Sequence, residues 1–207
     1  MHIEAIPTGA FQEICYIVHN DAKQAIVLDP GDDAEVIEQR LGKLGLTVAA
    51  YVCTHAHADH INALAALHAN LPAPVAMHSN DWAWAFDSAN QIAPYYPVPA
   101  RPRIDTPMPL ESAKDWEFSG IRFQCIETPG HTPGGCCILF PEPGILIAGD
   151  TLFKGSCGRT DLPGGNPRQL KESLNKLKQL PDDVLVFPGH GEDTTIGTER
   201  ATNFFMQ

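Results

Sequence analysis

The 207-residue sequence is short of basic residues and contains no run of them. Lys and Arg together number 14 against 25 Asp and Glu, so the formal net charge is −11. Proteins that bind nucleic acid or an anionic membrane surface need basic patches. We therefore expect no nucleic-acid partner and no membrane partner.

Membrane spans, export signals and a disulfide framework are missing as well. No apolar stretch reaches the ~18 residues of a spanning helix, and Met1–Pro7 lacks the basic and apolar regions of a signal peptide. The six cysteines form no CxxC pair, and four of them lie in apolar runs, which is typical of reduced core thiols. These absences predict a cytoplasmic protein.

What remains is a composition able to build a core, with 43% hydrophobic and 19% charged residues. We predict strands at 14–19, 25–28, 48–53, 75–77, 121–126, 136–140, 145–148 and 184–187, and helices from an Asp32 or Asp33 cap to about Leu44, from 59 to 67 and from 167 to 179. Helices packed outside two stacked sheets would give an α/β fold, a four-layer αββα sandwich. We expect residues 1–207 to form one such domain.

The most polar segment of the chain directly follows an apolar strand. Residues 54–60 read Thr-His-Ala-His-Ala-Asp-His and come after the apolar run 48–53. Buried polar groups need a hydrogen-bond or ionic partner, and a divalent metal supplies one. Imidazole and carboxylate ligands suit zinc and also accept iron or manganese.

Three further apolar strands each deliver a histidine or an aspartate just past their carboxyl ends: His131, Asp150 and His190. Sites in α/β proteins gather beyond those ends. Taken singly, each residue could be an ordinary surface or core residue, and the 54–60 cluster could be a structural metal site. Taken together, they predict one catalytic centre with two divalent metal ions.

The donors divide into two sets with one bridging residue. Three histidines would leave an open position for water, the pattern of a catalytic zinc. The first set consists of His55, His57 and His131. The second set consists of Asp59, His60 and His190, and the bridging residue is Asp150.

The motifs Thr-His-x-His-x-Asp-His, Pro-Gly-His-Thr-Pro-Gly, Gly-Asp and Pro-Gly-His-Gly, in this order, resemble those of the metallo-β-lactamase-fold hydrolases. Segments 149–155 and 189–195 are most similar to the short type II glyoxalases, which are hydroxyacylglutathione hydrolase-like proteins. The resemblance implies the αββα sandwich, the two-metal site and hydrolysis of a small-molecule thioester such as S-D-lactoylglutathione by a metal-bound hydroxide. Asp59 is the expected catalytic residue, because it would orient that hydroxide. We expect zinc, with iron or manganese as alternatives, and a monomer or small homo-oligomer.

Three features concern the substrate. Full-length type II glyoxalases carry a C-terminal helical domain that helps to bind glutathione, and we expect none here. Arg159 matches the position of a basic residue that contacts glutathione, whereas Asp161 replaces the aromatic residue two positions on. The proline-rich segment 87–109, with Tyr95 and Tyr96, is expected to form a wall of the substrate cleft; an ordinary surface loop is the alternative.

Other activities of the same fold stay open. Segments 131–134 and 158–161 also resemble persulfide dioxygenases, whose single iron would be held here by His55, His131 and Asp150. Those enzymes usually place Ala where Gly189 stands, which favours the hydrolase. Lactone or lactam hydrolysis is a further alternative, although Asp150 stands where many β-lactamases of this fold carry Cys.

Overall fold

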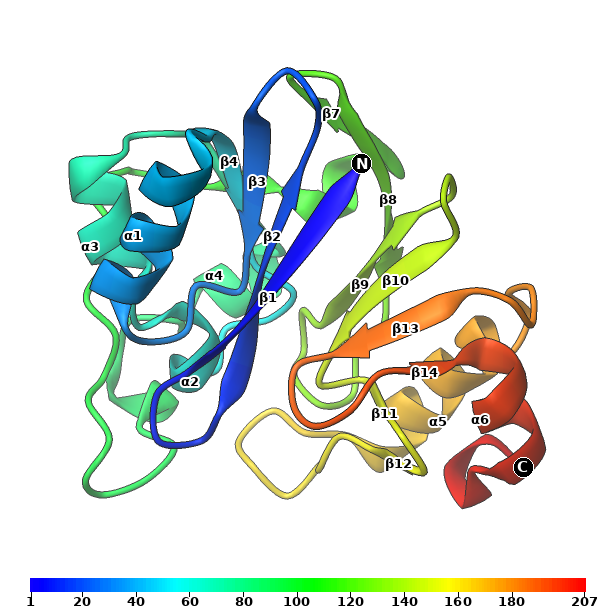
Figure 1. Ribbon diagram of the computed structural model, residues 1–207. Coiled ribbons are helices and arrows are strands. Elements are labelled where there is room, and N and C mark those ends of the chain that lie inside the picture. The colour runs from blue at the N-terminus through cyan, green and yellow to red at the C-terminus, as the bar shows by residue number, and fades with distance from the viewer.

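The computed structural model describes the whole chain except the side chain of Ser112, and it contains two six-stranded mixed sheets with helices on their outer faces (Figure 1). The first sheet has the order β1 (His2–Thr8), β2 (Glu13–His19), β3 (Gln24–Leu28), β4 (Thr47–Val52), β5 (Val75–Met77) and β6 (Met108–Pro109). The second has the order β14 (Thr194–Thr195), β13 (Leu185–Pro188), β10 (Ile145–Gly149), β9 (Cys136–Phe140), β8 (Ile121–Glu127) and β7 (Asp115–Phe118). The predicted four-layer αββα sandwich is confirmed.

The remaining elements cover the sheets or connect them. The first sheet is followed or interrupted by α1 (Ala34–Leu44), α2 (Ala58–Ile61), α3 (Leu64–Asn70), α4 (Ser79–Trp82) and the 3₁₀ turns η1 (Ser88–Asn90) and η2 (Leu110–Ser112). The second carries the hairpin β11 (Leu152–Phe153) and β12 (Ser156–Cys157), helices α5 (Pro167–Leu177) and α6 (Ile196–Thr202), and the turn η3 (Phe204–Met206). Among the described residues, no helix is both long enough and apolar enough to span a membrane.

Strands with nearly continuous apolar sequence form because both faces of each sheet are buried. Side chains alternate along β2: Cys15 and Ile17 face the core under α1 and α3, whereas Tyr16 and Val18 face the core between the sheets. A third core lies between the second sheet and α5 and α6. Three apolar layers thus hold four layers of backbone together.

The sequence pattern located the buried strands well and missed the edge elements. Strands β1, β7 and β14 and helix α6 were not predicted, because β1 and β7 expose about every second residue and β14 has only two residues. The helix predicted at 59–67 is two helices, α2 and α3. Asp33 stands at the predicted N-cap position of α1, but its backbone is left-handed (φ 51°) and its carboxylate accepts a hydrogen bond from Gly9 N in place of a capping one. The Asp32 carboxylate accepts from Asn62 and Tyr96.

Candidate metal centre

The loops that leave four strands meet at one edge of the sandwich (Figure 1). Strand β4 ends two residues before Thr54, and the loop behind it carries the first histidines into α2. The loops after β10 and β13 lie side by side, joined by a hydrogen bond of 2.8 Å from Gly189 N to Gly149 O. Ile14 N of β2 donates to Gly189 O at 2.8 Å, so the first sheet holds the turn that carries His190.

The first predicted donor set is brought together with its nitrogen atoms converging. Nδ1 of His57 lies 2.8 Å from Nε2 of His131. The His55 ring centroid lies 5.0 Å from that of His57 and 4.9 Å from that of His131. One ligand atom from each of the three lies within 4.8 Å of the others, and all three residues are buried.

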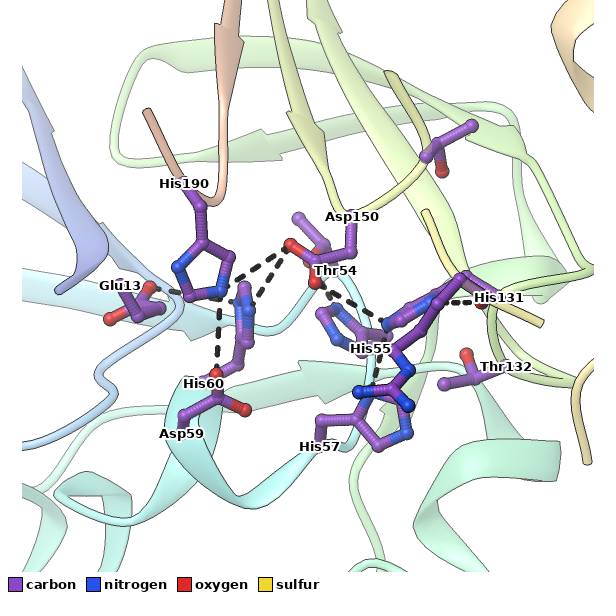
Figure 2. Close-up of polar contacts among 12 residues, drawn as sticks. Glu13, Thr54, His55, His57, Asp59, His60, His131, Thr132, Asp150 and His190 are labelled. Carbon is purple, nitrogen blue, oxygen red and sulfur yellow. Dashed lines mark hydrogen bonds and ion pairs between the residues drawn. The ribbon is translucent and has the colours of Figure 1, made fainter. Parts of the chain in front are cut away.

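The second set also converges, and Asp150 lies between the two sets (Figure 2). His190 Nε2 lies 3.3 Å from Asp59 Oδ2. Asp150 Oδ1 is 3.3 Å from His60 Nε2, and Asp150 Oδ2 is 3.4 Å from His131 Nε2. One carboxylate therefore contacts a member of each set, which is the geometry of a bridging ligand.

Several of these polar atoms are buried without a hydrogen-bond partner among the described residues: His55 Nε2, His60 Nε2 and Asp150 Oδ1. A buried donor or acceptor left unpaired costs about 1–3 kcal/mol, so native structures rarely keep several in one place. A divalent cation would satisfy all three atoms. The donor chemistry, imidazole nitrogen and carboxylate oxygen, fits zinc, iron or manganese.

In four of these histidines, the Nδ1 atom lies within hydrogen-bond distance of an oxygen atom. The pairs are His55 Nδ1 with Thr54 Oγ1 (3.1 Å), His60 Nδ1 with Asp29 Oδ2 (3.1 Å), His131 Nδ1 with Arg159 O (2.8 Å) and His190 Nδ1 with Phe11 O (3.2 Å). An acceptor at Nδ1 keeps the proton there and leaves Nε2 bare for a metal. The rings are thereby oriented before any ion binds.

The protonation states in the site suit metal binding at neutral pH, except at His60. Burial lowers the pKa of His55 well below its usual range and that of His57 to about 3, so both rings are neutral. Burial alone would raise the pKa values of Asp59 and Asp150, but the neighbouring imidazoles, His60 first and His190 among them, together outweigh it and both are lowered. Burial alone would lower the pKa of His60, whereas Asp150 and Asp59 raise it well above its usual range. His60 therefore has to release a proton when an ion binds.

Three buried carboxyl groups near the site were not predicted from the sequence to belong to it. Asp29 accepts hydrogen bonds from Thr54 N and Thr54 Oγ1, both at 2.6 Å, besides His60. Although Asp29 lies near His55 and His60, its oxygens are already occupied, so we assign it to orienting the ligands. Its position directly after strand β3 matches the strand-end signal that located the other ligands. Burial raises the pKa of Glu13, which lies 3.7 Å from His60 Nδ1, well above its usual range.

The third missed carboxyl group ties two ligand loops together. Asp81, at the start of α4, accepts from Ala56 N at 2.9 Å, from Thr132 Oγ1 at 2.7 Å and from Gly134 N at 2.6 Å. Ala56 lies between His55 and His57, and Thr132 follows His131. Asp81 thus fixes the spacing of the three-histidine set, and no motif around it announces this role.

Glycine is required where two ligands approach the backbone. A Cβ atom on Gly189 would lie 2.4 Å from Asp150 Oδ1 and 2.6 Å from His60 Cε1. A Cβ atom on Gly31 would lie 2.0 Å from Asp59 O. Any side chain at position 189 would therefore displace the bridge or a ligand of the second set.

A cavity of about 220 Å³ opens onto the converging ligands. Its other walls are Phe11, Ile92, Leu162 and Arg159, so segment 87–109 contributes Ile92. Neither predicted tyrosine is among the lining residues: Tyr96 is buried with its hydroxyl donating to Asp32, and Tyr95 is exposed. Both rings pack against Phe11, at centroid distances of 5.1 Å for Tyr96 and 6.4 Å for Tyr95. Their part in substrate binding stays a prediction.

Residues 8–190 match the family model described as the Metallo-beta-lactamase superfamily. The chain is 34% identical over 211 residues to hydroxyacylglutathione hydrolase GloC of Haemophilus influenzae, covering 100% of this chain and 98% of that protein. It is similar to the crystal structure of BLEG-1 B3 metallo-beta-lactamase, with a TM-score of 0.94, 35% identity and full coverage of both chains. The structure of TTHA1623 in a di-iron-bound form matches with a TM-score of 0.84 and 36% identity, over 98% of this chain and 99% of that one.

Proposed function

The chain belongs to the metallo-beta-lactamase superfamily, and we propose that it is a metallo-hydrolase that cleaves thioesters with two divalent metal ions. The observation that carries this proposal is the placement of Asp150 between two converging donor sets. His55, His57 and His131 would hold one ion and Asp59, His60 and His190 the other. Zinc is the proposed metal; the di-iron form of TTHA1623 makes iron the first alternative.

Bound there, the metal pair would lower the pKa of a water molecule and polarise a carbonyl oxygen. The chain supplies orientation. Asp59 has a lowered pKa, so its carboxylate is an acceptor only and can fix the direction of the attacking water through a hydrogen bond. Because ionised Asp59 is a weak base, we assign it positioning and not proton storage.

The cavity favours a leaving group that departs without a proton. Among the described lining residues, the two aspartates have lowered pKa values, His57 is neutral with a pKa of about 3, and His131 and His190 would be occupied as metal ligands. Arg159 stays protonated at all working pH values. A thiol with a pKa near ~8.5 can leave as its thiolate, whereas an amine needs protonation. This difference supports a thioester as the substrate.

The walls of the cavity indicate the kind of thioester. Phe11, Ile92 and Leu162 offer apolar surface to an acyl group, and Arg159 offers a cation to an acidic carrier. S-D-lactoylglutathione is the first substrate to test, since the similar Haemophilus influenzae protein is named a hydroxyacylglutathione hydrolase.

The test uses the full chain loaded with zinc, or with iron in parallel. We expect two ions per chain and release of free thiol from S-D-lactoylglutathione, both lost or strongly reduced in Asp59→Ala. Hydrolysis by Asp59→Ala at the wild-type rate would remove the scheme. One iron per chain with oxygen uptake on a persulfide would assign the dioxygenase alternative instead.

A second candidate is lactam hydrolysis, because the BLEG-1 structure covers the full chain with a TM-score of 0.94. A chromogenic cephalosporin assayed beside the thioester decides between them. Thiol release at least a hundredfold faster than ring opening is the result that we expect from a cavity without a ready proton donor.

A further inference from the structure

A second, larger hollow lies on the other side of Arg159 from the metal centre. This carrier groove, of about 580 Å³, runs between the loop after β12, helix α5 and the C-terminal turn η3. Figure 1 shows the C-terminus beside α6, on the side of the second sheet that carries α5. Arg159 lines both the groove and the metal cavity, so the two hollows meet at this side chain.

The walls of the groove are apolar and firmly held. Leu170 and Leu174 of α5 form its floor and belong to the core of the second sheet. Phe204 and Phe205 form its rim and are 81% and 47% exposed, with ring centroids 5.7 Å apart. Exposed apolar patches of this kind mark binding surfaces.

A buried amide anchors the backbone of the turn that carries the two phenylalanines. The Asn203 side chain donates to Ser156 O at 2.9 Å and to Glu199 Oε2 at 2.8 Å, and its Oδ1 accepts from Phe205 N at 2.9 Å. The rim is therefore anchored to β12 and to α6. A preformed apolar surface binds without the entropy loss of ordering it.

Two side chains that line the groove carry a positive charge, in a chain whose net charge is −11. They are Arg159, which makes a two-pronged ion pair with Asp161 (2.7 Å for each contact), and Lys171. Lys171 is exposed on α5 and has no carboxylate partner within the described part of the chain. The groove thus matches a ligand with an apolar segment and a separate anionic end.

We propose that the carrier groove binds the thiol carrier of the substrate, and that this carrier is a pantetheine-type arm, whose methylene and gem-dimethyl groups would cover the apolar walls and whose far end is a phosphate. The inference rests on the proposed thioester hydrolysis. In that reaction the acyl–sulfur bond breaks, the acyl carbon takes the hydroxyl of water, the sulfur leaves as a thiolate, and the remaining proton of the water passes to solvent. The acyl group then occupies the smaller cavity, the carrier passes over Arg159, and its phosphate reaches Lys171. Glutathione has two carboxylates and no branched alkyl group, so it would leave more of the apolar walls uncovered.

The test measures binding apart from turnover. Desulfo-coenzyme A, which has no sulfur to ligate a metal, is titrated calorimetrically into the metal-loaded full chain. We expect Phe204→Ala/Phe205→Ala to raise its Kd roughly tenfold or more and Lys171→Glu to raise it three- to tenfold. Lys43→Glu, an equal charge change at an exposed site on α1, should leave Kd unchanged.

Kinetics with a matched pair of substrates complete the test. D-lactoyl-coenzyme A and S-D-lactoylglutathione carry the same acyl group on different carriers. In both groove variants, kcat/KM for the coenzyme A thioester should fall roughly tenfold relative to kcat/KM for the glutathione thioester. The fall should come from a higher KM, with kcat unchanged.

Two results would overturn the inference and leave the proposed function standing. One is wild-type affinity for desulfo-coenzyme A in both groove variants while thioester hydrolysis continues. The other is a dimer in light scattering that Phe204→Ala/Phe205→Ala dissociates, which would assign the groove to a second copy of the chain. Hydrolysis of neither thioester by the metal-loaded wild type would instead remove the proposed function, and the inference with it.

Discussion

The Asp29 carboxylate lies 3.1 Å from Nδ1 of His60, while the Nε2 atom of the same ring lies 3.3 Å from Asp150. The ring is therefore held between a carboxylate that is not assigned as a metal ligand and the bridging carboxylate. Asp29 also accepts two hydrogen bonds from Thr54, and Thr54 Oγ1 contacts His55. One buried side chain thus orients a ligand in each donor set.

Asp29→Ala should weaken metal binding without touching a proposed ligand. Loss of such an outer partner typically lowers metal affinity 10- to 100-fold. Zinc titration against a competing chelator gives the affinities. Asp105→Ala, an exposed carboxylate on the proline-rich segment, is the matched control and should bind as the wild type does. Equal zinc affinity in Asp29→Ala and the control would contradict the assigned role.

Gly189→Ala should reduce the metal content from two ions per chain toward one. The added Cβ would lie 2.4 Å from Asp150 Oδ1 and 2.6 Å from His60 Cε1, so either the bridge or the second set has to move. Elemental analysis of the purified variant measures the stoichiometry. Gly42→Ala in α1 has open space around its Cβ and should keep both ions, with a stability gain of about 0.5–1 kcal/mol. Two tightly bound ions in Gly189→Ala would show that the close approach is not required.

Asp81→Ala should destabilise the metal-free protein by about 3 kcal/mol or more. It leaves two buried N–H groups and one hydroxyl without their acceptor, at roughly 1–3 kcal/mol for each unpaired group. Urea unfolding in the presence of a chelator measures the loss. Asp81→Asn keeps an acceptor oxygen and should recover part of it. A stability within about 0.5 kcal/mol of the wild type, which is the usual range for surface substitutions, would show that the two loops do not depend on this carboxylate.

In the metal-free protein, the contributions of His57 and His60 to stability should together be largest near pH 6.5 and fall on both sides. The pKa of His57 is about 3 in the folded chain and near ~6.5 when unfolded. Below pH 6.5 the unfolded chain therefore binds the extra proton, which costs about 2 kcal/mol of stability at pH 5. The pKa of His60 is raised, so its contribution is fully present below pH 6.5 and is lost as pH rises through the raised value.

Urea unfolding at pH 5, 6.5 and 8 with chelator present measures how the free energy of unfolding falls on the acid side and on the alkaline side of pH 6.5. His57→Gln removes one of the two depressed imidazoles, so the loss of stability between pH 6.5 and pH 5 should become smaller, whereas His2→Gln, at an exposed position, should not change it. Stability that rises steadily from pH 6.5 to pH 5 in the wild type would contradict the assignment.

The sequence alone was enough to predict the four-layer fold and the seven side chains that converge. The fold was predicted from the order of apolar strands and helices together with the motif resemblance, and the seven side chains from polar residues that stand just past the carboxyl ends of apolar strands. The donors of residues 54–60 are close in the chain, so their proximity needs no tertiary information. His131, Asp150 and His190 could be added because each follows the same kind of strand.

Only the tertiary structure decided which groups support that site and what lies beside it. Asp81 and Glu13 carry no local signal, because the partners of a buried carboxyl group depend on which loops pack around it. The carrier groove joins Arg159, α5 and the C-terminal Phe204 and Phe205, which are separated along the chain and are brought together by the packing of α5 and η3. Periodicity reports which face of an element is buried, but the contacts between elements are made only when the chain folds.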